Sequence, residues 1–203
     1  MNKQCVIVLG MADTLVQEAD TDYIGADHGS LVLADAGIRM VCAIGDFDSV
    51  SEAEVQRIQS MADEFIRMNP VKNDSDSEAV VRYAIEKGYR NINVYGALGG
   101  RIDHEIVNLK LAEEFAGILT LVNEQNSITA LNPGIYPVND AHFKFFSIFA
   151  LVPSVVTYEG FKYPLDHRTI NPGDLYGVSN ELLDHTGTLT VHSGKVLAIH
   201  SRD

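Results

Sequence analysis

The first 115 residues alternate between short apolar runs and stretches of helical spacing, and this alternation restricts the possible folds more than any other feature of the sequence. Four apolar runs have the composition of strands, at 4–9, 23–26, 40–44 and 91–95. Four segments are predicted to be helical, at 31–36, 51–66, 75–88 and 103–115. Repeated strand–helix units predict a mostly parallel sheet with helices on its faces.

Two of the predicted helices carry a signal at their first turn. Ser51 with Glu54, and Ser75 with Glu78, have the spacing of a capping box. In this motif the serine and glutamate side chains each satisfy a backbone N–H group that the helix leaves without a partner. The signals predict that the helices begin just after Ser51 and Ser75.

The pattern changes near residue 116, where strand-like segments rich in β-branched and aromatic residues replace the alternation. These segments lie at 118–123, 127–131, 143–152, 188–192 and 195–200. Ser193-Gly194 separates the last two and predicts a two-residue hairpin turn. We therefore predict two domains, an α/β domain over 1–116 and an all-β sandwich or small barrel over 117–203.

The chain carries 28 Asp and Glu against 15 Lys and Arg, a formal charge of −13. Proteins that hold nucleic-acid backbones or anionic membranes present positive surfaces, so this charge argues against both partners. No apolar stretch reaches the roughly 18 residues that a membrane-spanning helix needs. Cys5 and Cys42 lie in apolar runs and are expected to be buried free thiols of a reducing compartment, which indicates a cytoplasmic protein.

An acidic motif, GDFDS at 45–49, directly follows the strand predicted at 40–44. In a parallel sheet, the loops at the carboxyl ends of the strands line the ligand crevice. Asp46 and Asp48 are separated by one residue and can converge on a hard cation through oxygen ligands. The same residues also fit a plain acidic turn before a helix, because carboxylates favour a helix N-terminus.

A second acidic segment runs from Lys72 to Glu78. The capping box explains Ser75 and Glu78. Asp76 either interacts favourably with the positive end of the helix dipole or adds a third carboxylate to a metal site. Lys72 is the cation of this segment and is suited to a phosphate group.

The third segment reads GALGGRIDH and follows the last predicted strand of the α/β part. Gly99 and Gly100 let backbone N–H groups approach phosphate oxygens, and Arg101 adds a planar set of donors. Asp103 also fits a helix N-cap, and His104 also fits a partly buried helix residue. The segment has the spacing of neither a Walker A loop nor a dinucleotide fingerprint.

Because each of the three segments follows a predicted strand, they are expected to meet at one edge of the sheet. Asp46, Asp48 and Asp76 would then hold Mg²⁺. Lys72, Arg101 and the glycine backbone would hold a polyphosphate. Such a site performs phosphoryl-type transfer, in which positioning and charge neutralisation supply most of the catalysis.

In this order and at these separations, the segments resemble the thiamine pyrophosphokinase (thiamine diphosphokinase) family. The residues that carry the resemblance are GDFDS at 45–49, DSDSE at 74–78, GGRIDH at 99–104, ADHG at 26–29 and GVSNE at 177–181. The resemblance covers nearly the whole chain. The chain departs from the family pattern at His28, Asn73 and Ser75.

The resemblance implies a catalytic α/β domain, a thiamine-binding β-sandwich, and a homodimer with active sites between subunits. The implied enzyme is a diphosphotransferase that moves the pyrophosphoryl group of ATP to thiamine with Mg²⁺, giving thiamine diphosphate and AMP. Asp46, Asp48 and Asp76 match the metal-binding acids, and Arg101 and Asp103 match residues of the reaction centre. The residues assigned to substrate or nucleotide binding are Asp27, Ser49, Lys72, Ser75, Gly99, Gly100, His104, Ser179 and Asn180.

Other functions stay open at this point. The same chemistry on another hydroxymethyl heterocycle, such as a pterin, depends on the β domain, where Ser179-Asn180 is the only indication of the substrate. A non-catalytic module that senses nucleotide or thiamine would have no need of three metal carboxylates. A glycosyltransferase that uses Asp-x-Asp would usually have a longer chain.

Overall fold

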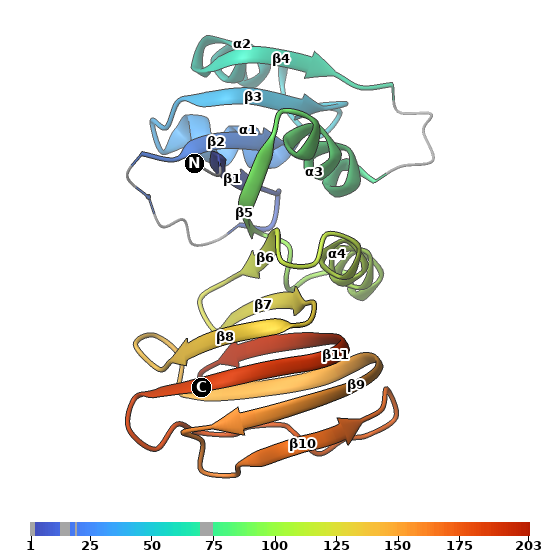
Figure 1. Cartoon of the computed structure of the whole chain (residues 1–203). Coiled ribbons are helices and arrows are strands. Elements are labelled where there is room, and N and C mark those ends of the chain that lie inside the picture. The colour runs from blue at the N-terminus through green and yellow to red at the C-terminus, as the bar shows by residue number, and fades with distance from the viewer. Residues whose placement is uncertain (1–2, 13–16, 19, 70–74) are drawn as a thin grey trace. The chain divides into compact units, whose positions relative to one another are not determined.

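A computed structural model describes residues 3–12, 17–18, 20–69 and 75–203. The chain divides into two compact units. Unit 1 contains residues 1–111 and 121–123, and unit 2 contains residues 112–120 and 124–203. Figure 1 labels the helices and strands of both units.

Unit 1 is built on parallel strands in the order β4-β3-β2-β1-β5. The strands are β1 Lys3–Val8, β2 Asp22–Ala26, β3 Met40–Gly45, β4 Ala62–Arg67 and β5 Tyr89–Tyr95. The central strand β1 is buried from Cys5 to Val8, as a strand covered on both faces should be. Together with the helices below, this sheet confirms the predicted α/β class of the N-terminal part.

The helices of this part are α1 His28–Asp35, α2 Glu52–Met61, α3 Asp76–Glu86 and α4 Ile102–Glu114. α1 and α2 contact each other and share a core cluster with Val6 and Val8 of β1. α3 follows β4 and returns the chain to β5, so a right-handed connection places it on the opposite face of the sheet (Figure 1).

The two predicted helix starts are confirmed, but their caps differ. At Ser51 the hydroxyl accepts the N–H of Glu54 at 3.4 Å, and the Glu54 carboxylate accepts the N–H of Ser51 at 2.7 Å. At Ser75 the hydroxyl accepts the N–H of Glu78 at 3.2 Å. Glu78 instead pairs with Arg82 one turn later at 2.9 Å, so only the serine half of that capping box forms.

The helix predicted at 51–66 is wrong in its last third. α2 ends at Met61, and Ala62 is already extended, with φ −111° and ψ 138°. The apolar spacing that suggested one helix is divided between two elements, with Ile58 buried on α2 and Phe65 partly buried on β4. β4 pairs along the length of β3, and these hydrogen bonds with a strand distant in the sequence override the local helical pattern.

Unit 2 is an antiparallel β structure in the order β10-β9-β11-β7, with β8 also paired to β11. Its strands are β7 Asn126–Leu131, β8 Gly134–Asn139, β9 Phe145–Glu159, β10 Leu165–Ile170 and β11 Thr186–Ser201. The short strand β6, Leu119–Val122, lies where the chain passes between the two units. The predicted all-β character of the C-terminal part is confirmed.

The two long strands of unit 2 fold over into facing layers. Phe146 and Tyr158 belong to the same strand, β9, yet their ring centroids are only 5.9 Å apart. An extended strand would separate them by about 40 Å. Phe161 contacts both rings and joins the same buried cluster. The core of unit 2 therefore lies between the two halves of β9 and β11, in the manner of a sandwich.

The hairpin predicted at Ser193-Gly194 is wrong, because β11 continues through both residues. The pairing of β11 with β9 shifts register between Val191 and Val196, as at a β-bulge. At this point the Ser154 hydroxyl accepts the N–H of Lys195 at 3.0 Å. Gly194, with φ +87°, thus bends a long strand where a turn between two strands was expected.

Gly194→Ala is expected to lower the free energy of unfolding by about 2 kcal/mol or more. A Cβ atom at Gly194 would lie 2.2 Å from the Ser154 hydroxyl oxygen and 2.5 Å from the Pro153 carbonyl oxygen. Gly173→Ala is the matched control, because a Cβ there meets nothing within 4 Å. Urea unfolding of both variants measures the difference, and equal midpoints would contradict this account of the bulge.

In the part of the chain that the structure describes, no helix is both long and apolar enough to cross a membrane. Cys5 and Cys42 are buried and free, as predicted. Burial raises the pKa of the Cys5 thiol to about 12 and that of the Cys42 thiol to about 11. Neither thiol is therefore a reactive thiolate near neutral pH.

Candidate active site

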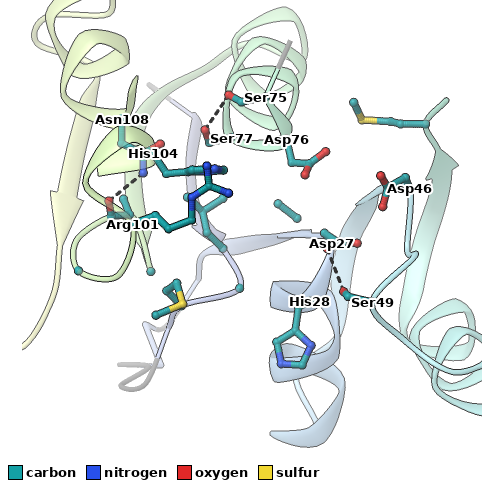
Figure 2. A pocket seen from close by; sticks show the side chains of 18 of the residues that line it. Asp27, His28, Asp46, Ser49, Ser75, Asp76, Ser77, Arg101, His104 and Asn108 are labelled. Carbon is teal, nitrogen blue, oxygen red and sulfur yellow. Dashed lines mark hydrogen bonds between the residues drawn. The ribbon is translucent and has the colours of Figure 1, made fainter. Parts of the chain in front are cut away.

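A pocket of about 560 Å³ opens in unit 1 where the parallel strands end (Figure 2). It is formed by the segments that follow the strands and by the first turns of α3 and α4. The sequence-predicted residues that line it are Asp27, Asp46, Ser49, Ser75, Asp76, Gly99, Arg101 and His104. His28, which departs from the family pattern, also lines the pocket and is exposed at the start of α1.

The other predicted site residues lie elsewhere. Asp48, Gly100 and Asp103 adjoin lining residues in the sequence without lining the pocket themselves. Lys72 lies outside the described residues. Ser179 and Asn180 belong to unit 2.

Asp27, at the end of β2, holds the acidic loop that follows β3. Its carboxylate accepts the backbone N–H of Phe47 at 3.0 Å and the hydroxyl of Ser49 at 3.2 Å. Its own N–H donates to the carbonyl of Ile44 at 2.8 Å. This close approach requires a glycine at position 45, because a Cβ atom on Gly45 would lie 2.8 Å from the Cα atom of Asp27.

Three carboxylates gather at this point. One oxygen from each of Asp27, Asp46 and Asp48 lies within 4.8 Å of the other two. The Asp46 carboxylate also accepts the N–H of Asp48 at 3.1 Å, which closes a tight turn. A group of oxygen ligands at these separations suits a hard cation such as Mg²⁺.

Asp76 brings a further carboxylate to the pocket from a different element, outside the close group of Asp27, Asp46 and Asp48. It is the first residue of α3, and in Figure 2 its side chain and that of Asp46 face the same part of the pocket. The hydroxyls of Ser75 and Ser77 lie 3.0 Å apart beside it. The N-terminus of α3 thus presents hydroxyl groups and the positive end of a helix dipole to the pocket, where an anionic ligand is stabilised.

Arg101 enters the pocket from the segment after β5 (Figure 2). Its Nε and Nη2 atoms donate to the two carboxylate oxygens of Asp103 at 3.1 and 2.5 Å. The guanidinium lowers the pKa of Asp103 to about 2. Since α4 begins at Ile102, Asp103 lies within the first turn of the helix and is not its N-cap. It stays ionised at neutral pH and holds Arg101 in a planar fork.

Asn108 is a pocket residue that no sequence motif predicted. This side chain lines the pocket, is only 6% exposed, and donates to the carbonyl of Ala97 at 2.8 Å. It lies one helical turn after His104, so both residues share a face of α4. That spacing from a suspected site residue was the available signal. The other lining residues that lie outside the motifs found in the sequence are Leu9, Gly10, Met11, Met68 and Asn69.

In unit 2, the side-chain amide of Asn180 is hydrogen-bonded to backbone groups through both its oxygen and its nitrogen. Its Oδ1 atom accepts the N–H groups of Tyr163 and Glu181 at 3.1 and 3.0 Å. Its Nδ2 atom donates to the carbonyl of Tyr163 at 2.9 Å. The N–H of Ser179 donates to the hydroxyl of Ser147 at 2.9 Å. Asn180 is buried, so it fixes the shape of this segment, while Ser179 keeps its own hydroxyl available at the surface.

Comparisons with known proteins agree with this geometry. The model of the thiamin pyrophosphokinase catalytic domain matches residues 13–120, and that of the thiamin pyrophosphokinase vitamin B1 binding domain matches residues 135–196. The thiamine pyrophosphokinase of Bacillus subtilis (strain 168) is 35% identical over 191 residues, which are 90% of this chain and 88% of that protein.

Solved structures give the same result. A thiamine pyrophosphokinase structure from Bacillus subtilis superimposes with a TM-score of 0.89 at 32% identity, covering 99% of this chain and 100% of that one. A thiamin pyrophosphokinase family protein from Enterococcus faecalis superimposes with a TM-score of 0.90 at 28% identity, with the same coverage of both chains. The chain belongs to the thiamine pyrophosphokinase family.

Proposed function

We propose that this chain transfers the pyrophosphoryl group of ATP to the hydroxyl of thiamine, giving thiamine diphosphate and AMP. The observation that carries the proposal is the match of both domains of the family, catalytic and vitamin B1 binding, to one chain. The pocket volume of about 560 Å³ lies in the range of small-molecule sites. A pterin substrate is not favoured because the vitamin B1 binding match covers 135–196, and a sensor is not favoured because the catalytic match covers 13–120.

The proposed metal site consists of Asp46, Asp48 and Asp76, which would hold Mg²⁺. The fit rests on the donor set. Oxygens of Asp46 and Asp48 lie within 4.8 Å of each other, Asp76 lines the same pocket as Asp46, and carboxylate oxygens are the ligands that this ion prefers. Asp27 belongs to the same close group, but its oxygens already hold Phe47 and Ser49, so its proposed role is to position the loop. When bound, Mg²⁺ neutralises charge on the phosphate oxygens.

The residues of this chain are proposed to bind and orient both substrates. Arg101 donates to the transferring phosphoryl group, and the N-termini of α3 and α4 with Gly99 and Gly100 receive the remaining phosphate oxygens. Ser75, Ser49 and His104 contact the nucleotide from the pocket wall. The thiamine hydroxyl then attacks the β-phosphorus in line, and AMP leaves. Lys72 is proposed to meet a phosphate as well.

The thiamine ring is proposed to bind at Ser179-Asn180, which lies inside the vitamin B1 binding match. In this proposal the catalytic domain spans 1–116 and the thiamine-binding domain spans 117–203. The chain acts in the cytoplasm, which agrees with its two buried free thiols.

An assay with ATP, Mg²⁺ and thiamine tests the proposal directly. Thiamine diphosphate and AMP are expected in equal amounts by chromatography and ³¹P NMR. Formation of ADP with thiamine monophosphate would refute pyrophosphoryl transfer while leaving the fold unaffected. A parallel reaction with a hydroxymethylpterin is expected to release no AMP. If the enzyme instead used the pterin in preference to thiamine, the pterin would be identified as the substrate.

A homodimer with active sites between subunits is also part of the proposal. α4 exposes Ile102 and Ile106, which are 67% and 52% accessible in the single chain and lie one turn apart. Light scattering is expected to give twice the chain mass of 22.2 kDa. Ile106→Asp is expected to shift the protein towards the monomer, because it places a charge in an apolar contact. A monomeric wild-type protein would contradict this part of the proposal.

A further inference from the structure

The loop with Asp46 and Asp48 is held on two opposite sides. Asp27 holds it from the end of β2, as described above. On the other side lies β4, whose following residue Met68 donates its N–H to the carbonyl of Gly45 at 2.8 Å. The acidic turn therefore sits between two neighbours of β3, and only the first of them carries a residue of the recognised motifs.

Phe47, between the two aspartates, points into the protein. It is only 3% exposed, and its ring stacks on the ring of Phe65 in β4, with centroids 4.6 Å apart and planes inclined by 19°. This stack joins the loop of Asp46 and Asp48 to β4, the strand whose residues were predicted to be the end of a helix. Phe65 is opposite Ala43 in the ladder between β3 and β4, so the β-sheet fixes its place.

The backbone at Phe47 is in the left-handed region, with φ +56°. A bulky side chain rarely adopts this conformation, which persists only where the surroundings enforce it. Here the enforcing contacts are the N–H of Phe47 donated to Asp27 and the ring of Phe47 on Phe65. The reversal at Phe47 lets the N–H of Asp48 return to the carboxylate of Asp46 and brings both acids near Asp27.

We propose that Phe65 is a positioning residue for divalent-metal binding: its ring holds Phe47 in the turn that makes Asp46 and Asp48 converge. The inference rests on the proposed function, in which these acids hold the metal. Phe65 itself contacts neither the metal nor a substrate. Without its ring, the turn would sample conformations in which the carboxylates diverge. Part of the free energy of metal binding would then be used to bring the carboxylates together again, so the observed affinity would fall.

Mn²⁺ serves as the probe, titrated into the full-length protein alone and followed by electron paramagnetic resonance of the free ion. Phe65→Leu is expected to weaken Mn²⁺ binding about five-fold, the size expected for the loss of one aromatic stack. Phe65→Tyr keeps the ring and is expected to bind within about two-fold of the wild type. The tyrosine hydroxyl has room, because Phe65 lines an open groove with Gln56 and Gln59.

Ile66→Ala is the matched control for lost packing. Ile66 is the neighbour of Phe65 on β4, and its side chain points to the other face of the sheet. It is expected to lower the melting temperature as much as Phe65→Leu does while leaving Mn²⁺ affinity unchanged. In the steady state, Phe65→Leu is expected to need more Mg²⁺ than the wild type for half-maximal activity, whereas Ile66→Ala should need the same Mg²⁺ concentration as the wild type.

The outcomes test the metal site and the role of Phe65 separately. If Asp46→Asn abolishes Mn²⁺ binding but Phe65→Leu binds as the wild type does, the metal site stands and the role of Phe65 is wrong. Equal weakening by Phe65→Leu and Ile66→Ala also overturns the role of Phe65, because it shows a general packing effect. If the wild type fails to bind Mn²⁺, or if Asp46→Asn binds it normally, the proposed metal site itself fails.

Discussion

Asp46→Asn is expected to lower kcat/KM by at least about 10²-fold, comparable to the loss of one preorganised electrostatic group in other enzymes. The substitution keeps the local structure, because the amide oxygen of asparagine can still accept the N–H of Asp48 that Asp46 accepts now. It removes only the charge. The effect on activity therefore reports the charge at this position and not the shape of the turn.

The same substitution is expected to leave the protein at least as stable as the wild type. Asp27, Asp46 and Asp48 each place a carboxylate oxygen within 4.8 Å of the other two, and like charges at such separations repel one another when no cation is bound. Removing one charge relieves this repulsion, so the urea midpoint should stay equal or rise while activity falls. Such an opposite response is typical of functional residues, whose arrangement is not the one that stability favours.

Asp63→Asn is the control for this experiment. Asp63 also lies in unit 1, but it pairs on the surface with Arg39 at 2.8 Å and its side chain is 64% exposed. Its loss is expected to change activity by less than about two-fold, because exposed ion pairs contribute little. A fully active Asp46→Asn enzyme, or a fully active Asp46→Asn/Asp48→Asn double variant, would remove these residues from the mechanism.

The convergence of the site segments at one sheet edge was predictable because it follows from topology. Strands that are parallel place their carboxyl ends together, so any loop that follows a buried strand reaches the same edge. The loops after β3 and β5 were found in this way, and Asp46 and Arg101 both line the pocket. Asp27 follows β2 in the same manner, and the pairing of β2 with β3 explains why it approaches the Asp46 loop.

β4 was not predictable from local spacing. Residues 51–66 satisfy a helical pattern throughout, and no glycine or proline marks the change at Ala62. Residues 62–67 form a strand because of contacts with residues distant in the sequence. These contacts are the ladder with β3 and the ring contact between Phe65 and Phe47. The bulge at Gly194 has the same origin, since the partner that shapes it is Ser154 on another strand. Local patterns cannot distinguish a glycine that ends a strand from one that bends it.

The expected result for Arg101→Ala is a fall in kcat/KM for ATP of about 10²- to 10³-fold. Arg101 is 74% exposed and has no packing role, so the unfolding midpoint should hardly change. Arg101→Lys is expected to recover only a small part of the activity, because an ammonium group cannot donate in the planar fork of a guanidinium. Arg39→Ala, which breaks a similarly exposed ion pair in the same unit, is the control and should be fully active.

The role of Asp103 can be resolved by combining it with Arg101. A carboxylate whose pKa is lowered to about 2 is a weak base near neutral pH, so we expect Asp103 to orient Arg101 and not to accept the proton of the thiamine hydroxyl. Asp103→Asn should then lower kcat/KM for ATP about ten-fold and leave the acid limb of the pH–rate profile in place.

A double-mutant cycle decides between the two roles. If Asp103 acts through Arg101, the Arg101→Ala/Asp103→Asn enzyme should be no slower than Arg101→Ala, because the group that Asp103 positions is already gone. If Asp103 is a general base, the two losses in kcat/KM should multiply. Arg101 would then stabilise the phosphoryl group and Asp103 would accept the proton, which are independent contributions to the rate. If the double variant is slower than Arg101→Ala by the same factor by which Asp103→Asn is slower than the wild type, proton transfer is assigned to Asp103. The two direct hydrogen bonds from Arg101 to Asp103 favour the other result, in which Asp103 positions Arg101.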